Sequence, residues 1–411
     1  MQKIFESIDT CRSCNSKDIE KILDLGKQPP ANSLYESKEN VPPSVPLRLF
    51  FCKKCSTVQL GDTVDPKYLF QEYFWVTGTS TTANAYSHIF TKNVLSRTNI
   101  NQPFIIEIAS NDGTFLKSFS EKDCEILGID PAKNIAEKAT KDGIPTLNEF
   151  FNAELAKKLK GNKGMADVIF ARNVMPHVKD IHSILEGIKV LMHEDSIGAI
   201  EFHRAGLILQ ELHYDYIYHE HLFYFSLKTI SNLLEKYDLK VFDITDSPIS
   251  GGSWVIYFSK IKRNKTMELK KVEKLELETG VNKIQSWRNF AVKALEHSQK
   301  LKNMVKRKNK ILAYGASARS STLLNFCGID SLYISAIIDK NPLKHGLHTP
   351  GSNIPIISFE QGKEIIKNEN KVLLLAWNFE DEVVSDLRKA GFKGEIIVPL
   401  PNDPHIIHEV Y

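Results

Sequence analysis

The chain has 411 residues, 42% of them hydrophobic and 25% charged, a composition typical of a globular protein with two or three domains. Its 53 Lys and Arg residues nearly balance its 50 Asp and Glu residues, so the net charge of +3 does not indicate a nucleic-acid-binding protein. No apolar run approaches the roughly 18 to 20 residues of a membrane span, and the first ten residues lack the apolar region of a secretory signal. We therefore expect a cytoplasmic protein, a monomer or weak oligomer, with neither membrane nor nucleic acid as a partner.

Two Cys-x-x-Cys pairs, Cys11/Cys14 and Cys52/Cys55, lie near the start of the chain. A two-residue spacer lets two thiolates of one tight turn reach the same ion, and two such turns complete the tetrahedral four-sulfur shell of a structural zinc. A redox pair is the alternative, but such a pair usually occurs singly beside a strand–helix unit. Because a closed shell leaves no position for a substrate, we expect this zinc to stabilise a loop-rich ribbon and not to catalyse.

Two further patterns predict a strand and a helix in the N-terminal part, and two cysteines lie outside the Cys-x-x-Cys pairs. Alternating residues at 47–51 indicate a strand of the zinc ribbon, and apolar residues at three- and four-residue steps predict a helix within 71–97. Cys124 and Cys327 lie in apolar stretches, so we expect them to be buried and unreactive.

Strand and helix patterns alternate from Pro103 onward. Buried strands are predicted at 104–109, 125–130 and 167–172, and a glycine-containing turn and a helix follow the first of them. Successive strand–helix–strand units imply a parallel, doubly wound sheet whose ligand lies at the carboxyl ends of the strands.

The same arrangement recurs near the C-terminus, with strands at 310–314 and 333–339 around a turn and a helix. In each half an acidic residue closes the second strand, Asp130 in the first and Asp339 in the second. Between the halves, residues 263–310 are charge-rich with apolar residues at helical spacing, which predicts a long helix or a helical pair that is mostly a solvated connector.

The expected fold class is therefore α/β with three domains. We predict a zinc ribbon at 1–68, a central Rossmann-like domain at 69–262, and a C-terminal Rossmann-like domain with the helical connector at 263–411.

The first Rossmann-like unit is a candidate cofactor site. Its turn does not match G-x-G-x-x-G, and a dinucleotide pyrophosphate would have to approach Ala109 and Ser110, where glycine is wanted. The carboxylates around the turn favour S-adenosylmethionine (SAM), which is positively charged at sulfur and has no phosphate. Dinucleotide binding and an empty Rossmann-like fold remain the alternatives. The candidate cofactor residues are Glu107, Ala109, Ser110, Asn111, Asp112, Gly113, Asp130 and Asn173.

Several motifs then follow one another in a characteristic order. They are the two Cys-x-x-Cys pairs, Glu107-Ile-Ala-Ser-Asn-Asp-Gly-Thr114, Asn173-Val-x-x-His177, Tyr218-His-Glu-His221, Tyr224-Phe-Ser, Gly251-Gly-Ser253 and Tyr314-Gly-Ala-Ser-Ala318. Together, from Cys11 to about Asn378, they resemble the sugar C-methyltransferase family. The resemblance implies SAM-dependent methylation of a carbon of a nucleotide-linked 4-keto-deoxysugar. It also implies a C-terminal domain that helps to hold the sugar nucleotide.

Methyl transfer to carbon requires a base beside a carbonyl, because carbon becomes nucleophilic only as an enolate. His221 is the natural base, since an unperturbed pKa of about 6.5 leaves it mostly neutral at cellular pH. Tyr218 and Glu220 can hold the imidazole or bind sugar oxygens, and the resemblance implies that Tyr218 and His221 lie at the reacting carbon with Glu220 nearby. His177 matches a further active-site histidine of the family. Without the resemblance, a satisfied polar patch would be the simpler interpretation of this cluster.

Other polar and aromatic residues near these motifs have no assigned role. We expect His203, His213 and His219 to be structural or to face solvent. Tyr216 and Tyr224 are as well explained by aromatic packing as by a place in the pocket wall.

The substrate-binding candidates follow in the second half. The Gly251-Gly252-Ser253 turn allows close backbone approach to a ligand, although a plain tight turn explains it equally well. Similar sequences often carry a His before the two glycines and an Arg after the Ser; here there is Ser250 and no Arg, which leaves substrate details open. Arg319, where the family often has Lys, would keep a cation near a diphosphate. The other candidates are Tyr314, Gly315, Ala316, Ser317, Asp339 and Trp377.

Three other functions remain to be weighed. NAD binding in the second unit would make the protein a sugar oxidoreductase, but its turn has only one glycine. A histidine that deprotonates a hydroxyl would make it a sugar-nucleotide O-methyltransferase. A non-catalytic binding protein would use the Rossmann-like units only as scaffolds. The sequence names neither the nucleotide (dTDP, GDP or CDP) nor the carbon, nor the destination of the product.

Overall fold

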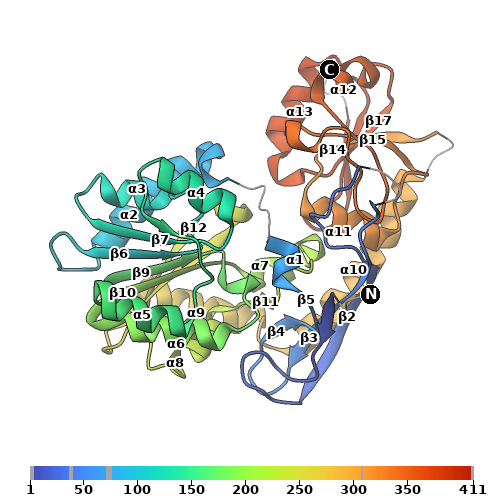
Figure 1. The fold of residues 1–411 in the computed structure, drawn as a ribbon. Helices are drawn as coiled ribbons and strands as arrows, with labels where there is room; N and C mark the ends of the chain where they lie inside the picture. The colour runs from blue at the N-terminus through green and yellow to red at the C-terminus, as the bar shows by residue number, and fades with distance from the viewer. Residues whose placement is uncertain (1–3, 37–39, 71–75, 307–308, 409–411) are drawn as a thin grey trace.

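The computed structural model describes residues 4–36, 40–70, 76–306 and 309–408. Three main β-sheets organise the chain (Figure 1), and each has helices or loops packed against it. A small two-stranded sheet of β1 (Phe5–Ser7) and β5 (Asp62–Val64) accompanies the N-terminal one. Among the described residues no helix is long and apolar enough to cross a membrane.

The N-terminal sheet has the strand order β11-β4-β3-β2. Its strands are β2 (Ile19–Gln28), β3 (Val45–Cys52), β4 (Val58–Leu60) and β11 (Phe223–Tyr224). Leucines at alternate positions of β2 and β3 are buried, as the two-residue period of a strand requires. β11 comes from far along the chain, so this sheet shares a strand with the segment that carries the Tyr218–His221 motif. The short helix α1 (Pro66–Phe70) follows the sheet.

The central sheet is doubly wound and has the order β12-β13-β10-β9-β6-β7-β8. Its strands are β6 (Phe104–Ile108), β7 (Glu125–Ile129), β8 (Thr146–Leu147), β9 (Ala166–Arg172), β10 (Met192–His203), β12 (Lys240–Ser247) and β13 (Ser253–Ser259). The strands β8, β7, β6, β9 and β10 are parallel, and β13 and β12 continue the sheet antiparallel. The three strands predicted at 104–109, 125–130 and 167–172 lie side by side as β7, β6 and β9.

Helices cover both faces of this sheet (Figure 1). They are α2 (Thr81–Leu95), α3 (Thr114–Ser120), α4 (Lys133–Lys141), α5 (Ala153–Lys163), α6 (Ile181–Leu191), α7 (Ala205–Gln210) and α8 (Leu227–Glu235). α2 and α3 share one apolar cluster with the sheet, while α5, α6 and α8 belong to the other. The helix predicted within 71–97 begins at Thr81, because the Ser80 side chain accepts the Ala83 N–H and ends the preceding turn. Residues 71–75 of that prediction lie outside the described residues.

The C-terminal sheet has the order β16-β15-β14-β17-β18-β19 and lies at the upper right of Figure 1. Its strands are β14 (Ile311–Tyr314), β15 (Ile334–Ile338), β16 (Ile356–Ile357), β17 (Lys371–Leu374), β18 (Glu395–Val398) and β19 (His405–Ile407). All neighbours are parallel except β18 and β19. The helices α11 (Ala318–Cys327), α12 (Phe359–Ile366) and α13 (Glu380–Lys389) accompany it.

The connector is a helical pair, α9 (Met267–Thr279) and α10 (Ile284–Val305), as predicted, and most of its residues are exposed or only partly buried. α10 nevertheless buries a stripe of Trp287, Phe290, Ala294 and Leu301. These apolar residues recur at helical spacing and form one face, which joins the main apolar core. Cys124 and Cys327 are buried, as expected.

Candidate functional site

The four predicted zinc ligands converge on one point. The Sγ atoms of Cys11 and Cys55 lie 3.6 Å apart, as do those of Cys14 and Cys52, and all four lie within 4.8 Å of one another. A tetrahedral zinc with Zn–S bonds of about 2.3 Å places its sulfurs about 3.8 Å apart. The donor set therefore fits a structural zinc that has no open position.

The zinc domain packs on the central domain next to this site. The imidazole Nε2 of His182 lies 3.0 Å from the carbonyl oxygen of Arg12, between the first two cysteines. The Arg12 Nε donates to the carbonyl of Leu60 at 3.1 Å and thereby connects the Cys11–Cys14 turn to β4. Loss of the metal would thus disturb both the ribbon and its seat on the central domain.

The turn after β6 has an unusual backbone. Ala109, Asn111 and Gly113 have φ values of 54°, 51° and 77°, a region that residues other than glycine seldom adopt. The side chains of Asn111 and Asp112 hold the turn, because they accept the N–H groups of Thr77 at 2.8 Å and Gly78 at 3.0 Å. Strain of this kind persists where a site over-determines the backbone.

Two carboxylates lie behind this turn and differ in their hydrogen bonds. Asp130 accepts the N–H of Asn111 at 2.8 Å and that of Ala132 at 2.9 Å, one on each oxygen, so it joins the two turns and keeps its remaining lone pairs. Glu107 is 2% exposed, and its Oε2 has no hydrogen-bond partner among the described residues. Burial raises the pKa of Glu107 well above its usual value.

Further polar atoms at the same edge of the central sheet are also without a hydrogen-bond partner among the described residues. Within the described part of the chain, Ser110 Oγ and Asn173 Oδ1 are buried without one. A buried acceptor left unpaired is costly, typically about 1–3 kcal/mol, so these atoms and Glu107 Oε2 fit a ligand rich in ammonium and hydroxyl donors. SAM is such a ligand, and the residues present suit it.

A buried ion pair supports this edge, and the sequence did not predict it. Arg172 Nε lies 2.8 Å from Glu201 Oε2, and Ser247 also donates to Glu201. The carbonyl of Glu201 accepts the Asn173 N–H at 2.9 Å and holds Asn173 at a φ of 51°. The one available signal was an acidic residue within the otherwise apolar run 197–202.

The Tyr218–His221 motif lies in the turn before β11 and faces His177. His177 and His221 have ring centroids 4.8 Å apart, and those of Tyr218 and His221 are 4.0 Å apart. The Nδ1 of His221 lies 2.9 Å from the carbonyl of Tyr216, and that of His177 lies 2.9 Å from the carbonyl of Glu220. Because a carbonyl only accepts, Nδ1 of the neutral His221 ring carries the proton and its Nε2 carries the lone pair.

Burial sets the charge states in this cluster. It lowers the pKa of His177 to about 4 and that of His221 well below its usual value, so both rings are neutral at cellular pH. Burial raises the pKa of Glu220 to about 7, although a hydrogen bond from Asn32 lowers it in part. Asn32 Nδ2 donates to Glu220 Oε1 at 2.6 Å. Asn32 comes from the N-terminal domain, and no motif of the sequence pointed to it.

The three histidines without an assigned role are buried, which agrees with the structural alternative of the prediction. His203, His213 and His219 are 3%, 2% and 1% exposed. They are buried because β10 and the segment after α7 pack into the core beside the motif, with His203 against Tyr216 at 4.2 Å between ring centroids. Tyr216 in turn lies 4.2 Å from His221, so Tyr216 contacts the candidate base directly.

The Gly251–Gly252 turn is exposed and left-handed. The φ values of Ser250, Gly251 and Gly252 are 59°, 77° and 126°. A Cβ on Gly252 would lie 3.1 Å from Nη2 of Arg204, so the glycine gives this guanidinium room. Ser253 is buried and donates to the carbonyl of Ile249 at 3.0 Å, which closes the turn.

In the turn after β14, the space next to Gly315 is occupied by another part of the protein. A Cβ on Gly315, whose φ is 98°, would lie 2.5 Å from Ala376 Cβ, so this glycine permits close packing. Ala316 N–H donates to Asp339 at 2.8 Å, and Asp339 also pairs with Lys344 at 3.3 Å. Ser317 caps α11, with its side chain accepting the N–H of the third helical residue. The buried Tyr314 hydroxyl has no partner in the described ranges.

Arg319 and Trp377 meet a carboxylate that the sequence did not single out. Asp215 accepts from Arg319 Nε at 3.0 Å and Nη2 at 3.1 Å, and from the Trp377 indole N–H at 2.9 Å. Asp215 is 1% exposed and precedes Tyr216, so this contact brings the C-terminal unit to the motif. The Arg319 guanidinium therefore already has an anionic partner.

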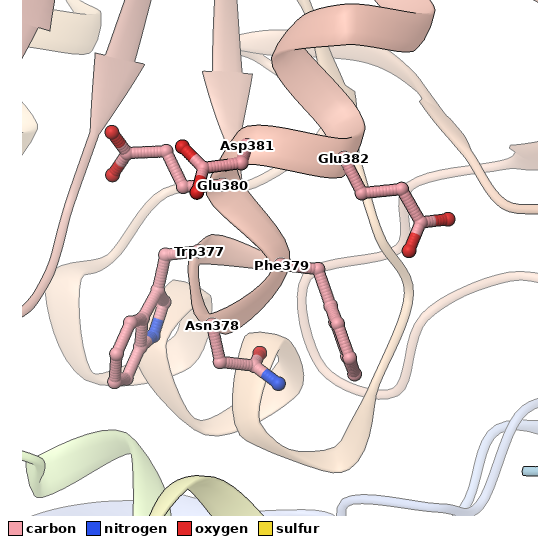
Figure 2. A pocket seen from close by; sticks show the side chains of 6 residues that line it. All are labelled: Trp377, Asn378, Phe379, Glu380, Asp381 and Glu382. Carbon is pink, nitrogen blue, oxygen red and sulfur yellow. The ribbon is translucent and has the colours of Figure 1, made fainter. Parts of the chain in front are cut away.

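A surface hollow lies next to Trp377 (Figure 2). It is lined by Trp377, Asn378, Phe379, Glu380, Asp381 and Glu382. Figure 2 shows the carboxylates above the two aromatic rings, at the start of α13. Three acidic side chains would repel a diphosphate, so this hollow is not its binding site.

Comparison with known proteins agrees with this arrangement. Three family models match in succession: a zinc binding domain at 11–70, a methyltransferase domain at 85–244 and a C-methyltransferase C-terminal domain at 248–401. The C-methyltransferase NovU of Streptomyces niveus is 28% identical over 417 residues, covering 99% of each chain.

Two solved structures of methyltransferases match less than half of the chain. Magnesium protoporphyrin IX methyltransferase of Synechocystis PCC 6803, with bound S-adenosylhomocysteine, is 9% identical with a TM-score of 0.36, over 47% of this chain and 92% of that one. The 1,6-didemethyltoxoflavin-N1-methyltransferase of Burkholderia thailandensis is 16% identical with a TM-score of 0.34, over 45% and 81%.

The doubly wound sheet, its turn and the ordered matches define a SAM-dependent methyltransferase with a zinc-binding domain. More particularly, the chain is a SAM-dependent C-methyltransferase.

Proposed function

We propose that the protein methylates the carbon next to the keto group of a nucleotide-linked 4-keto-deoxysugar. The observation that carries the proposal is His221, a neutral imidazole whose Nδ1–H is held by the Tyr216 carbonyl at 2.9 Å. This leaves a basic Nε2 in a cluster with Tyr218 and His177. A methyl transfer to oxygen or nitrogen has less need of such a base, because those atoms already carry lone pairs.

The proposed chemistry begins with removal of a proton from carbon. Nε2 of His221 takes the proton, and the electron pair of the C–H bond moves into the adjacent carbonyl to give an enolate. A positioned general base of this kind typically contributes about 10² to 10⁴ in rate. The Tyr216 carbonyl stabilises the resulting imidazolium through its hydrogen bond to Nδ1.

Two other groups of the motif act on oxygen. Tyr218 is the partly exposed member of the motif, so its hydroxyl can reach a substrate and donate to the enolate oxygen. Glu220, with a pKa of about 7, can exchange a proton or accept from a sugar hydroxyl near neutral pH. SAM held at the Glu107–Asp130 edge would supply the methyl group to the enolate carbon and leave as S-adenosylhomocysteine, and the proton taken by His221 would pass to solvent.

Two features support a sugar nucleotide as the substrate: the order of the motifs and the position of the C-terminal unit beside the Tyr218–His221 motif. The motifs resemble sugar C-methyltransferases from Cys11 to about Asn378, and the C-terminal unit meets the motif through Asp215. A second Rossmann-like unit at the site offers a place for the nucleotide.

The proposal is tested with a panel of dTDP-, GDP- and CDP-linked 4-keto-deoxysugars and SAM. Mass spectrometry should find one added methyl group on at least one of them, and NMR should place it on carbon. The same sugar nucleotide with its C4 keto group reduced is the control and should not react. A methyl group on oxygen would show an O-methyltransferase instead, and no product from any member of the panel would refute the sugar substrate.

A further inference from the structure

A loop of the zinc domain, residues 29–35, reaches the candidate active site. Pro29, Pro30 and Ala31 are buried, and the Ser33 N–H donates to the Pro30 carbonyl at 3.0 Å, which closes a tight turn. Proline fixes its own φ and restricts the residue before it, so this turn loses little conformational entropy on folding. Asn32 stands at the tip of the turn.

A hydrogen bond joins Asn32 of this loop to Glu220, which lies 188 positions further along the chain. Asn32 Nδ2 donates to Glu220 Oε1 at 2.6 Å. Glu220 is 5% exposed, whereas Asn32 is exposed, so the amide lies at the mouth of the site and the carboxyl group lies beneath it. A hydrogen bond to a buried, ionised acceptor is one of the stronger kinds, because the local dielectric constant is low.

The same loop is tied to the C-terminal unit three residues further on. Tyr35 donates from its hydroxyl to Asn353 Oδ1 at 2.8 Å, and its backbone exchanges hydrogen bonds with His348 at 3.2 and 2.8 Å. The loop is therefore held at both sides of Asn32: by the buried prolines before it and by the C-terminal unit after it. A residue held in this way can orient its partner precisely.

We propose that Asn32 is a positioning residue for Glu220, so that the zinc domain contributes a side chain to the active site. The Asn32 amide fixes which carboxyl oxygen of Glu220 faces the substrate and favours its ionised form. The catalytic relevance of this contact rests on the proposed function, whereas the contact itself does not.

The electrostatic surroundings make the contact measurable. The titratable groups beside Glu220 are His219 and His221 along the chain and His177, whose Nδ1 lies 2.9 Å from the Glu220 carbonyl, and burial keeps all three imidazoles neutral. Burial raises the pKa of Glu220 to about 7, and the Asn32 hydrogen bond opposes this rise. Removal of the amide should thus move the pKa of Glu220 further upward.

The decisive experiment titrates Glu220 in the full chain by NMR of ¹³C-carboxyl-labelled glutamate, with the resonance assigned by its loss in Glu220→Gln. Asn32→Ala should raise the Glu220 pKa by about one unit, since a charge-assisted hydrogen bond is worth about that much. Tyr35→Phe, which removes the neighbouring hydrogen bond to Asn353, is the matched control and should leave this pKa unchanged. An unchanged pKa in Asn32→Ala overturns the proposal, whether or not the sugar substrate is right.

Kinetics then test the catalytic part on the substrate that wild type accepts. Asn32→Ala should lower kcat/KM about tenfold, shift the limb of the pH profile that Glu220→Gln abolishes to higher pH, and leave SAM affinity unchanged. In the Glu220→Gln background the same change should cost less than about twofold, because the partner is gone. An equal loss in both backgrounds would show that Asn32 acts elsewhere.

Discussion

The two Rossmann-like units share one hydrogen-bonding pattern but differ in the polar groups that surround it. In each, the acidic residue after the second strand accepts one backbone N–H from the turn and one from two residues downstream: Asp130 from Asn111 and Ala132, Asp339 from Ala316 and Asn341. A carboxylate at this position therefore first serves to join two turns. Its presence alone does not identify a cofactor site.

The difference lies in the groups around each carboxylate. Around Asp130 the buried acceptors of Glu107, Ser110 and Asn173 have no partner among the residues described. Around Asp339, Lys344 supplies a cation and Ala376 fills the space above the glycine of the turn. Within the described part of the chain, the second unit keeps the unpaired Tyr314 hydroxyl at the end of its first strand, so the difference is the group of three unpaired acceptors around Asp130. This group, and not the strand–turn–helix pattern, distinguishes the unit in which we expect SAM.

Removal of the zinc should have the largest effect, and this effect should extend to the central domain. Cys52→Ser breaks the four-sulfur shell, and the metal contributes directly to the folding free energy of such a domain. Because β11 joins the N-terminal sheet to the His221 segment, we expect loss of soluble protein or a large drop in Tm, followed by circular dichroism. Cys124→Ser, a buried cysteine outside the shell, is the control and should be mild. Well-folded wild type with less than about half an equivalent of zinc would contradict the assignment.

The next largest effect should come from the candidate base. His221→Ala should bind SAM and sugar nucleotide almost normally but turn over about 10² to 10⁴ times more slowly, as measured by single-turnover kinetics. His345→Ala is the matched change at the second unit, where Nε2 lies 2.8 Å from the Asp339 carbonyl, and it should change kcat less than about twofold. If Tyr218→Phe loses the rate and His221→Ala keeps it, the base is Tyr218.

The carboxylates themselves allow a direct comparison of the two units. Asp130→Ala removes acceptors that we expect to bind the SAM ribose, so calorimetry should show SAM affinity weakened by roughly tenfold or more. Asp339→Ala disrupts the equivalent junction of the second unit and should leave SAM affinity as it is. Equal effects of the two substitutions would mean that Asp130 acts only by joining turns.

The smallest effect concerns stability in acid. Burial lowers the pKa of His219 to about 4, so between pH 6.5 and 4 the unfolded chain binds a proton that the folded chain does not. Stability therefore falls as the pH falls through this window, by about 1.4 kcal/mol per pH unit for such a histidine. His219→Gln should flatten the pH dependence of unfolding free energy by about this slope. The exposed His405→Gln of the second unit should not, and an identical slope in both variants would argue against a buried neutral His219.

The sequence predicted what depends on local pattern. Apolar runs located the strands at 104–109, 125–130 and 167–172 in the first unit and at 310–314 and 333–339 in the second. The spacing of four cysteines located the zinc site, because ligand geometry leaves a regular spacing. The motif around His221 was found by resemblance, and the structure adds the reason that its Nδ1 is protonated.

The parts that sequence reasoning missed depend on tertiary contacts. Glu201, Asp215 and Asn32 each act on a residue from a distant segment, so no spacing along the chain announces them. Arg319 was predicted to face a diphosphate, and that role stays a prediction, but its guanidinium is held by Asp215. The sequence left open whether His203 is structural or faces solvent, because the segment that covers the end of its strand is known only from the fold.

The central claim, that a base at this site removes a proton from carbon, is tested most directly by isotope exchange without SAM. Wild type is incubated in D₂O with the accepted 4-keto-sugar nucleotide, and NMR follows the proton on the carbon that is later methylated. We predict that this proton is replaced by deuterium in wild type and stays in place with His221→Ala. Methylation by wild type without any such exchange, under conditions where the substrate is shown to be bound, would contradict the account.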